Sequence, residues 1–225
     1  ANPYPWTVAD IEEWRRTFPA GGSEHDLVGV DDAGEVVGHA QAHRYPWTPA
    51  GRFAVSVLVH PRVRDRGLGH LLYSRVLGFV REHAATQLTT TVRADDQASL
   101  RFAEARGFAI DRHECEPRLD LANWQPDASS DPVAALEAQG VRFLAYADEP
   151  REAELYELVQ RNARDIPGHD PDAGPLPLDT WRQRWLEDPD SPPEGLILAV
   201  ADDRLVGVTF MGRYNEAGEL KTWHT

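Results

Sequence analysis

Residues 55–72 combine, in three consecutive segments, the residue types that proteins use to bind phosphate groups. Residues 55–60 are an apolar, β-branched run of strand length that a proline closes. Residues 64–69 form a glycine-containing turn, and apolar residues then recur at helical spacing from His70 to about His83. A strand, a glycine turn and a helix in this order direct backbone N–H groups and the positive end of a helix dipole at one point. This arrangement suits a phosphate or a pyrophosphate.

The two glycines of this turn, Gly67 and Gly69, both permit positive φ and lack a Cβ atom that would block close approach of a ligand. The alternative is an ordinary strand–helix connection in which Gly67 only tightens the turn. Two other phosphate-binding motifs are absent. The chain has no G-x-x-x-x-G-K-[ST], and no G-x-G-x-x-G that an acidic residue follows at ribose distance.

The pattern V-x-V-x-P-x-x-R-x-x-G-x-G-x-x-L resembles the acyl-CoA segment of the GNAT acetyltransferase superfamily. The matching residues are Val57, Val59, Pro61, Arg64, Gly67, Gly69 and Leu72. Downstream, residues 89–92 predict the next strand, and residues 96–108 resemble the family's following helix with its closing Gly-Phe pair. The combined spacing favours an acyl-CoA site over a plain turn.

This resemblance implies acetyl-CoA as co-substrate and no metal. In the family, the strand that matches residues 55–59 binds pantetheine through its backbone, and the turn from Arg64 to His70 binds pyrophosphate. The strand that matches residues 88–92 diverges and leaves a slot where the thioester meets an amine. The cofactor-binding residues that we expect are Val57, Leu58, Val59, Arg64, Asp65, Arg66, Gly67, Leu68, Gly69, His70, Asp96 and Ser99. Local positive potential would come from Arg62, Arg64 and Arg66.

Both catalytic positions depart from the family pattern. Ala103 occupies the place of the tyrosine that usually protonates the departing thiolate, and residues 54–57 offer no carboxylate base. The remaining candidates are His60, His113 and Tyr45, for each of which a structural role is an open alternative. The catalytic residues therefore stay unassigned.

Two functions remain open. The first is an N-acyltransferase that transfers an acetyl group from acetyl-CoA to a primary amine of a small molecule. The second is a non-catalytic acyl-CoA-binding scaffold that supports another catalytic domain. The missing tyrosine at Ala103 is the feature that separates them.

Composition excludes several other classes. The net charge of −14 argues against nucleic acid as a partner, because no basic face would offset phosphate repulsion. No apolar run approaches the roughly 18 residues of a membrane span. The single cysteine, Cys115, cannot form an internal disulfide, and no H-E-x-x-H or paired-cysteine spacing indicates a metal. With no visible signal peptide, we expect a cytoplasmic protein.

The first half of the chain predicts a helix that Thr7 caps, with Ile11, Trp14 and Phe18 on its buried face. Residues 27–30 and 36–42 then predict an antiparallel hairpin. Two closing strands are expected at residues 109–115 and 117–121.

The second half begins after a polar segment, residues 124–132, that is typical of a linker. A strand is predicted at 141–144, a helix at 151–164, a loop at 165–178 and a further helix that Asp179 caps. Residues 196–207 then repeat the hairpin pattern of residues 27–38 at a constant offset.

The repeat predicts two copies of one unit and a mixed α+β fold. Each would be a largely antiparallel, twisted sheet flanked by helices, as in tandem-GNAT proteins. The expected domains are 1–123, with the acyl-CoA segment, a linker at 124–132, and 133–225. On this alignment the first copy lacks its opening strand and helix, and the second, in which His224 is a candidate base, lacks its C-terminal half. We therefore expect a complementing segment or a homo-oligomer at the second copy.

Overall fold

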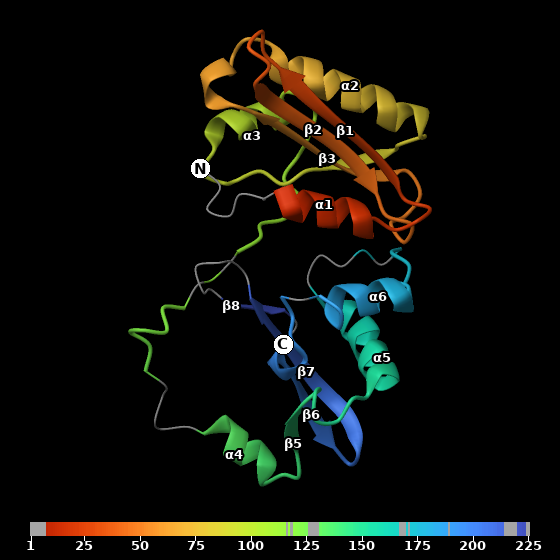
Figure 1. Ribbon diagram of the computed structural model, residues 1–225, viewed down its shortest axis with the longest axis vertical. Coiled ribbons are helices and arrows are strands. Elements are labelled where there is room, and N and C mark those ends of the chain that lie inside the picture. Colours follow the sequence, from red (N-terminus) through yellow and green to blue (C-terminus); the bar gives the residue numbers. More distant parts are fainter. Residues whose placement is uncertain are drawn as a thin grey trace. The chain divides into compact units, whose positions relative to one another are not determined.

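The computed structural model describes residues 8–115, 117, 119–125, 131–166, 170, 172–188, 190–213 and 220–223. The chain divides into two compact units, each with its own sheet (Figure 1). The first unit runs to Asp111 and includes Asp172–Gly174, and the second holds most of the chain from Arg112 onward. The domain boundaries predicted from the sequence stay predictions.

The first unit is built on a four-stranded mixed sheet in the order β1-β2-β3-β4. Its strands are β1 (Ser23–Val30), β2 (Val36–Arg44), β3 (Arg52–Val59) and β4 (Gln87–Thr89). The first three strands are antiparallel and β4 lies parallel to β3. Asp31 organises the β1–β2 turn, because its Oδ1 accepts hydrogen bonds from the backbone N–H groups of Ala33 and Glu35. The predicted hairpin is confirmed.

Four helical segments surround this sheet: α1 (Val8–Thr17), the short η1 (Pro61–Val63), α2 (Leu68–Glu82) and α3 (Gln97–Glu104). Figure 1 shows α1 and α2 on opposite faces of the sheet. The core lies under α2, whose Leu72, Val76 and Val80 are buried. They pack with buried residues of β2 and β3, namely Ala40, Ala42, Phe53 and Val55. The helix predicted from His70 thus begins two residues earlier.

Several predictions for the first half are wrong in detail. The strand expected at 88–92 is the shorter β4, and residues 109–115 are exposed coil, with no strand at residues 117, 119–121 either. The described residues of both segments are exposed, so neither segment buries a face against a sheet. Ile11 is 40% exposed because α1 packs through Trp14 and Phe18 instead. The predicted cap Thr7 lies outside the described residues.

The second unit carries an antiparallel sheet in the order β5-β6-β7-β8. The strands are β5 (Arg142–Ala145), β6 (Leu196–Ala201), β7 (Arg204–Arg213) and β8 (Leu220–Trp223). The helical segments are α4 (Pro132–Glu137), α5 (Glu152–Ala163), α6 (Leu178–Trp185) and η2 (Pro193–Gly195). The fully buried Trp181 of α6 and Leu155 of α5 pack with Leu198 and Phe210 of the sheet.

Two predictions here are corrected. The end of the predicted linker is helical, because Asp131 caps α4 by accepting a hydrogen bond from the N–H of Ala134. Asp179 does not cap α6, which begins after Pro177. It lies in the first turn and pairs with Arg182 at 3.0 Å. The mixed α+β fold, with one mixed and one antiparallel sheet between helices, is confirmed, whereas the tandem arrangement stays a prediction.

None of the described helices is both long enough and apolar enough to cross a membrane. Nor do the described residues include a group of three or more His, Cys, Asp and Glu side chains placed to hold a metal ion.

Candidate functional site

The start of α2 is open to an external anion. Gly67 precedes this 15-residue helix with φ 87° and makes no side-chain capping bond, and no acidic residue lies in the first turn. Helix geometry leaves the first backbone N–H groups, those of residues 68–70, without acceptors in the helix. A Cβ atom added at Gly67 would meet nothing within 4 Å. The helix dipole and the free N–H groups therefore converge on unoccupied space.

Gly69 has a different role from the one its spacing predicted. It lies inside α2 and is not among the glycines with positive φ. A Cβ atom there would lie 3.3 Å from Phe102 Cε2 of α3 and 3.5 Å from Val59 Cγ2. Gly69 thus permits close packing of α2 against α3 and β3, and the prediction that its missing Cβ makes room for a ligand is wrong. Its backbone N–H still points out of the helix start.

The three arginines of the turn are engaged to different extents. Arg64 Nε donates to the Val59 carbonyl at 3.1 Å and so ties the turn to the end of β3. Arg62 forms an ion pair with Asp31 at 2.9 Å, which offsets its charge. Arg66 is exposed. We therefore expect the local positive potential to come mainly from Arg66 and from the outer nitrogens of Arg64, not from all three side chains.

A gap in strand pairing adjoins this turn. β3 and β4 pair only at residues 52–54 with 87–89, so the rest of β3, from Val55 to Val59, lacks β4 as a neighbour. The His60 N–H donates to the Val37 carbonyl at 2.9 Å, which fixes the alternation of the antiparallel β2–β3 ladder. The backbone groups of Val55 and Val57 consequently point away from β2, into this gap. An extended ligand could hydrogen-bond there as a missing strand would.

Asp96 and Ser99 lie at the start of α3 and are occupied with capping it. Asp96 Oδ1 accepts from the Ser99 N–H at 3.0 Å, and its Oδ2 accepts from the Ser99 hydroxyl at 2.8 Å. These bonds, with the N–H bond the largest cause, lower the pKa of Asp96. Ten of the twelve predicted cofactor residues thus follow one another along β3 and the turn, whereas these two act at a neighbouring helix cap.

Comparison with known proteins finds a family match in the first unit. Residues 1–108 match the model of the Acetyltransferase (GNAT) family. This part of the chain is thus similar to GNAT acetyltransferases.

Similarity to longer GNAT-related proteins extends into the second unit. A mycothiol acetyltransferase of Nocardioides is 29% identical over 69% of this chain and 50% of its own length. One from Saccharopolyspora erythraea is 29% identical over 89% of this chain and 64% of its own. A crystal structure of a GCN5-related N-acetyltransferase from Sphaerobacter thermophilus superposes with TM-score 0.56 at 20% identity, over 88% of this chain and 59% of that one. The chain thus spans about half to two thirds of each relative, and the structural likeness shows the fold alone.

The structure gives structural or solvent-exposed surroundings to His60, His113 and Tyr45, the three described side chains that were predicted as catalytic candidates. His60 follows β3 and caps η1, because its Nδ1 accepts a hydrogen bond from the Arg62 N–H at 3.3 Å. His113 lies in exposed coil. Tyr45 stacks on Trp47 with ring centres 4.9 Å apart and contacts the rings of Phe18 and His43. The candidate His224 lies outside the described residues.

The structure reveals polar residues that the sequence analysis missed, on the sheet face that α1 covers. Glu24 and Asp26 of β1 lie on this face with His39 and His43 of β2, in neighbouring cross-strand positions. His39 Nε2 lies 3.0 Å from Asp26 Oδ1. The signal in the sequence was an even spacing of polar residues, with acidic residues at 24 and 26 and histidines at 39 and 43, which places each set on one face of its strand.

The acidic pair on this face is coupled. Burial, followed by the hydrogen bond to Asp26, raises the pKa of Glu24 to about 7. Burial also opposes ionisation of Asp26, but hydrogen bonds from Glu24 and His39 outweigh it and hold the Asp26 pKa below its usual value. Below neutral pH the shared proton therefore resides on Glu24. Burial lowers the pKa of His43, which stays neutral at pH 7.

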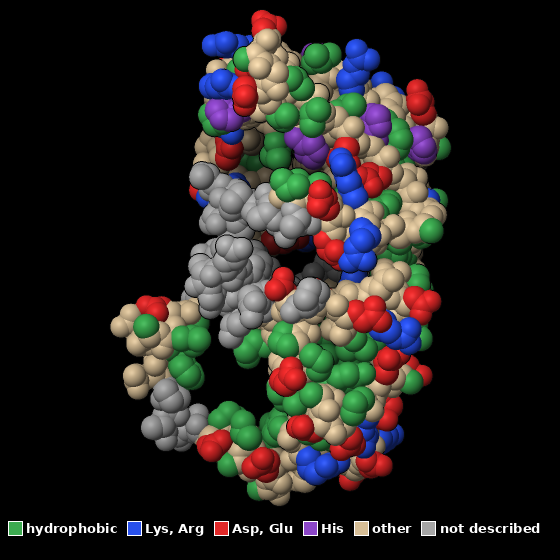
Figure 2. Space-filling view, in the orientation of Figure 1, with side chains coloured by type: hydrophobic (Ala, Val, Ile, Leu, Met, Phe, Trp, Pro, Cys, Tyr) green, Lys and Arg blue, Asp and Glu red, His purple; other side chains and the backbone are tan. Residues whose placement is uncertain are grey.

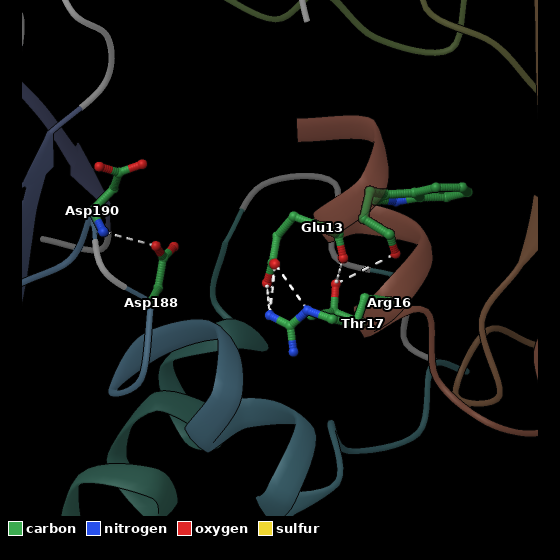
Figure 3. Close-up of polar contacts among 6 residues, drawn as sticks. Glu13, Arg16, Thr17, Asp188 and Asp190 are labelled. Carbon is green, nitrogen blue, oxygen red and sulfur yellow. Dashed lines mark hydrogen bonds and ion pairs between the residues drawn. The ribbon is translucent and has the colours of Figure 1, made fainter. Parts of the chain in front are cut away.

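The cation that α1 contributes to this face is Arg15, whose Nη2 lies 3.9 Å from Asp26 Oδ2. Its neighbour Arg16 instead pairs with Glu13 on the same helix, with contacts of 2.6 Å (Figure 3). In the second unit, Figure 3 shows only a local turn in which Asp188 accepts from the N–H of Asp190. On the face drawn in Figure 2, the visible histidine side chains lie on the first unit.

Proposed function

We propose that the first unit binds acetyl-CoA and transfers its acetyl group to a primary amine of a small molecule. The observation that carries the proposal is the uncapped start of α2 beside the unpaired end of β3. The pyrophosphate would lie on the N–H groups of residues 66–70, and the pantetheine would bond to the backbone of Val55 and Val57. No step of the proposal needs a metal.

The roles within the proposed cofactor site differ among its residues. Val57, Leu58 and Val59 would supply backbone and apolar contact to pantetheine, and Asp65 through His70 the anion cradle. Arg64 would act mainly by holding the turn on Val59, and Asp96 and Ser99 by fixing α3 beside it. These assignments follow the GNAT resemblance and the geometry of the turn together.

A basic small molecule suits the proposed acceptor site, because the α1 face carries the coupled carboxyl pair of Glu24 and Asp26. The net charge of −14 would also favour a cationic acceptor over an anionic one. Two of the relatives described above are named mycothiol acetyltransferases. The acceptor of this chain is to be identified by experiment.

A second candidate function is non-catalytic binding of acyl-CoA. It is favoured by Ala103, which is half-buried in α3. By the GNAT resemblance, this position usually holds the tyrosine that protonates the departing thiolate. In this alternative the first unit would support catalysis by a second GNAT unit, of which residues 133–225 would form part. The matching hairpins β1–β2 and β6–β7 support that repeat, since both are antiparallel and both shift register near their turn.

The test is release of free CoA from acetyl-CoA in the presence of a panel of small amines, measured with a thiol reagent. The full chain is compared with a Gly67→Asp variant that disables the proposed anion site. We expect amine-dependent CoA release by the wild type and at least a 10-fold loss in the variant. Binding of acetyl-CoA without release by any amine would support the scaffold function instead.

A further inference from the structure

The hairpins β1–β2 and β6–β7 have the same strand register, so positions in the two units can be compared one by one. Both are antiparallel, and in each the pairing shifts by one residue, between Gly29 and Val30 and between Ala199 and Val200. Residues at the same distance from this shift therefore correspond, and cross-strand pairs share a face. The corresponding positions on one face are Val28 with Leu198, Val30 with Val200, Val36 with Leu205, and His39 with Val208.

In the second unit this face is buried under a helix. Its aliphatic side chains belong to the core cluster of that unit, together with side chains of α5. The members concerned are Leu198, Val200 and Leu205 of the hairpin and Leu155, Leu158 and Val159 of α5. The strand before that helix, β5, pairs antiparallel with the outer edge of β6. β5 and α5 together thus cover both the apolar face and the edge of the hairpin.

The corresponding face of the first unit is exposed to solvent. Val28, Val30 and Val36 are 60%, 54% and 60% exposed, whereas their counterparts in the second unit are buried. Leu58 of β3 is 63% exposed and pairs with His39, so it extends the same face. We call Val28, Val30, Val36 and Leu58 the open patch. Apolar residues that gather on one exposed face are typical of an interaction surface.

A neighbouring position on each hairpin shows the reverse pattern. Val37 is 5% exposed in the first unit, and Val206, which occupies the same place in the register, is 54% exposed in the second. The two hairpins thus pack on a long helix with opposite faces, on α2 in the first unit and on α5 in the second. Exposure of the open patch therefore reflects which face has a helix and not a difference between the hairpins.

The first unit is also open at the edge that β5 occupies in the second. β1 is the outermost strand of its sheet, and none of the described strands pairs with its outer edge. α1 lies at the other end of the face, where Trp14 contacts the ring of His43. Since α1 and α6 each precede their hairpin in the chain, the described elements without a counterpart in the first unit are a strand and a helix that would come before α1.

A charged contact at the start of α5 has a matching group in the first unit. Arg151, the residue before α5, pairs with Asp203 of the β6–β7 turn at 2.7 Å. The β1–β2 turn carries Asp32, which is exposed. A helix placed on the open patch in the orientation of α5 would begin near this turn, so an arginine at its start would find a carboxylate there.

We propose that the open patch and the outer edge of β1 bind a strand–helix segment of the kind that β5 and α5 form, joined to the N-terminal side of α1. The strand would pair antiparallel with β1. The helix would place aliphatic residues at positions i, i+3 and i+4 on the open patch, as α5 does with Leu155, Leu158 and Val159. This interaction completes the fold of the first unit and does not depend on acetyl transfer.

The test supplies a surrogate segment to the full chain. Residues 141–164 are fused before Ala1 through a flexible glycine–serine linker, which gives docking an effective concentration on the order of millimolar. Hydrogen–deuterium exchange of residues 23–30 is then followed by mass spectrometry. We expect exchange of the β1 N–H groups that face away from β2 to slow by about 10-fold or more relative to the chain without the fusion.

The decisive variant is Val28→Asp, because a carboxylate within the open patch opposes its burial. In the fusion it should return the exchange of β1 to the rate seen without the fusion. In the chain without the fusion it should leave the exchange of β1 unchanged, since residue 28 is exposed there. The matched control is Val133→Asp, which changes a valine that is 49% exposed on α4 and should leave the protection intact.

Unchanged exchange of β1 in the fusion would overturn the proposal. Protection that Val28→Asp leaves in place would overturn it as well, because the open patch would then not be the contact surface. Protection of β1 that appears without the fusion and grows with protein concentration, together with a dimer in sedimentation, would identify a second copy of the chain as the occupant in place of a strand–helix segment.

Discussion

Gly67 and Gly69 lie two residues apart and remove a Cβ atom for different reasons. Gly67 has positive φ and faces open space, whereas Gly69 is helical and faces Phe102 of α3. The sequence spacing presents them as equivalent, because both belong to one motif. The difference between their roles depends on where α2 begins, which is at Leu68 and not at His70. A substitution at Gly67 should therefore affect mainly acetyl-CoA affinity, and a substitution at Gly69 mainly the stability of the fold.

We predict that Gly69→Val lowers stability rather than removing the cofactor site. Overpacking against Phe102 and Val59 should cost about 1–3 kcal/mol. Thermal unfolding should shift to lower temperature, while calorimetry on the folded variant should find acetyl-CoA affinity within a few-fold of the wild type. Loss of affinity with unchanged stability would show that the Gly69 Cβ enters ligand space after all.

Glu24 makes a second prediction at this scale, on the pH dependence of stability. Its pKa in the folded chain, about 7, lies above its ordinary value. The protonated form is therefore favoured by folding, and its contribution is complete below about pH 4.5 and lost as pH rises through about 7. Glu24→Gln should flatten the decline of the unfolding temperature across this window. An unchanged slope in parallel melts from pH 4.5 to 8 would contradict the carboxyl pair.

Among the elements, the turn between β3 and α2 depends on a side chain for its shape. Arg64 Nε binds the last carbonyl of β3, so Arg64→Ala should remove a hydrogen bond worth about 0.5–1.5 kcal/mol. We expect weaker acetyl-CoA binding whose relative loss persists at high salt, because the effect is on the conformation of the turn. A loss that disappears in salt, measured by calorimetry at two ionic strengths, would assign Arg64 to direct phosphate attraction.

The elements that the sequence predicted well are those with strong periodicity over their whole length. The apolar, β-branched run of β3 and the spacing of Leu72, Val76 and Val80 in α2 correspond to one buried interface, so pattern and structure agree. Residues 109–115 have no such periodicity, and they stay exposed without a partner strand. The contact between His39 and Asp26 escaped the sequence analysis because the two residues are 13 positions apart and meet only through the β1–β2 register.

For the chain as a whole, we predict one acyl-CoA site per chain. The described helices of the second unit do not offer an equivalent start, because Asp131 caps α4 and acidic residues lie in the first turns of α5 and α6. Carboxylates at a helix start occupy or repel an anion site. Titration should give a stoichiometry of one, and two equivalent sites would contradict the assignment of the turn.

The central claim is that the start of α2 holds the anion of acetyl-CoA, and calorimetric titration of Gly67 variants tests it most directly. Asn and Asp have nearly the same shape and both tolerate positive φ, so Gly67→Asn controls for bulk and strain. Gly67→Asp adds a negative charge where the phosphates would lie. We predict that the Asp variant binds acetyl-CoA at least 10-fold more weakly than the Asn variant, with a gap that narrows in salt. Equal affinities in two folded variants would contradict the account.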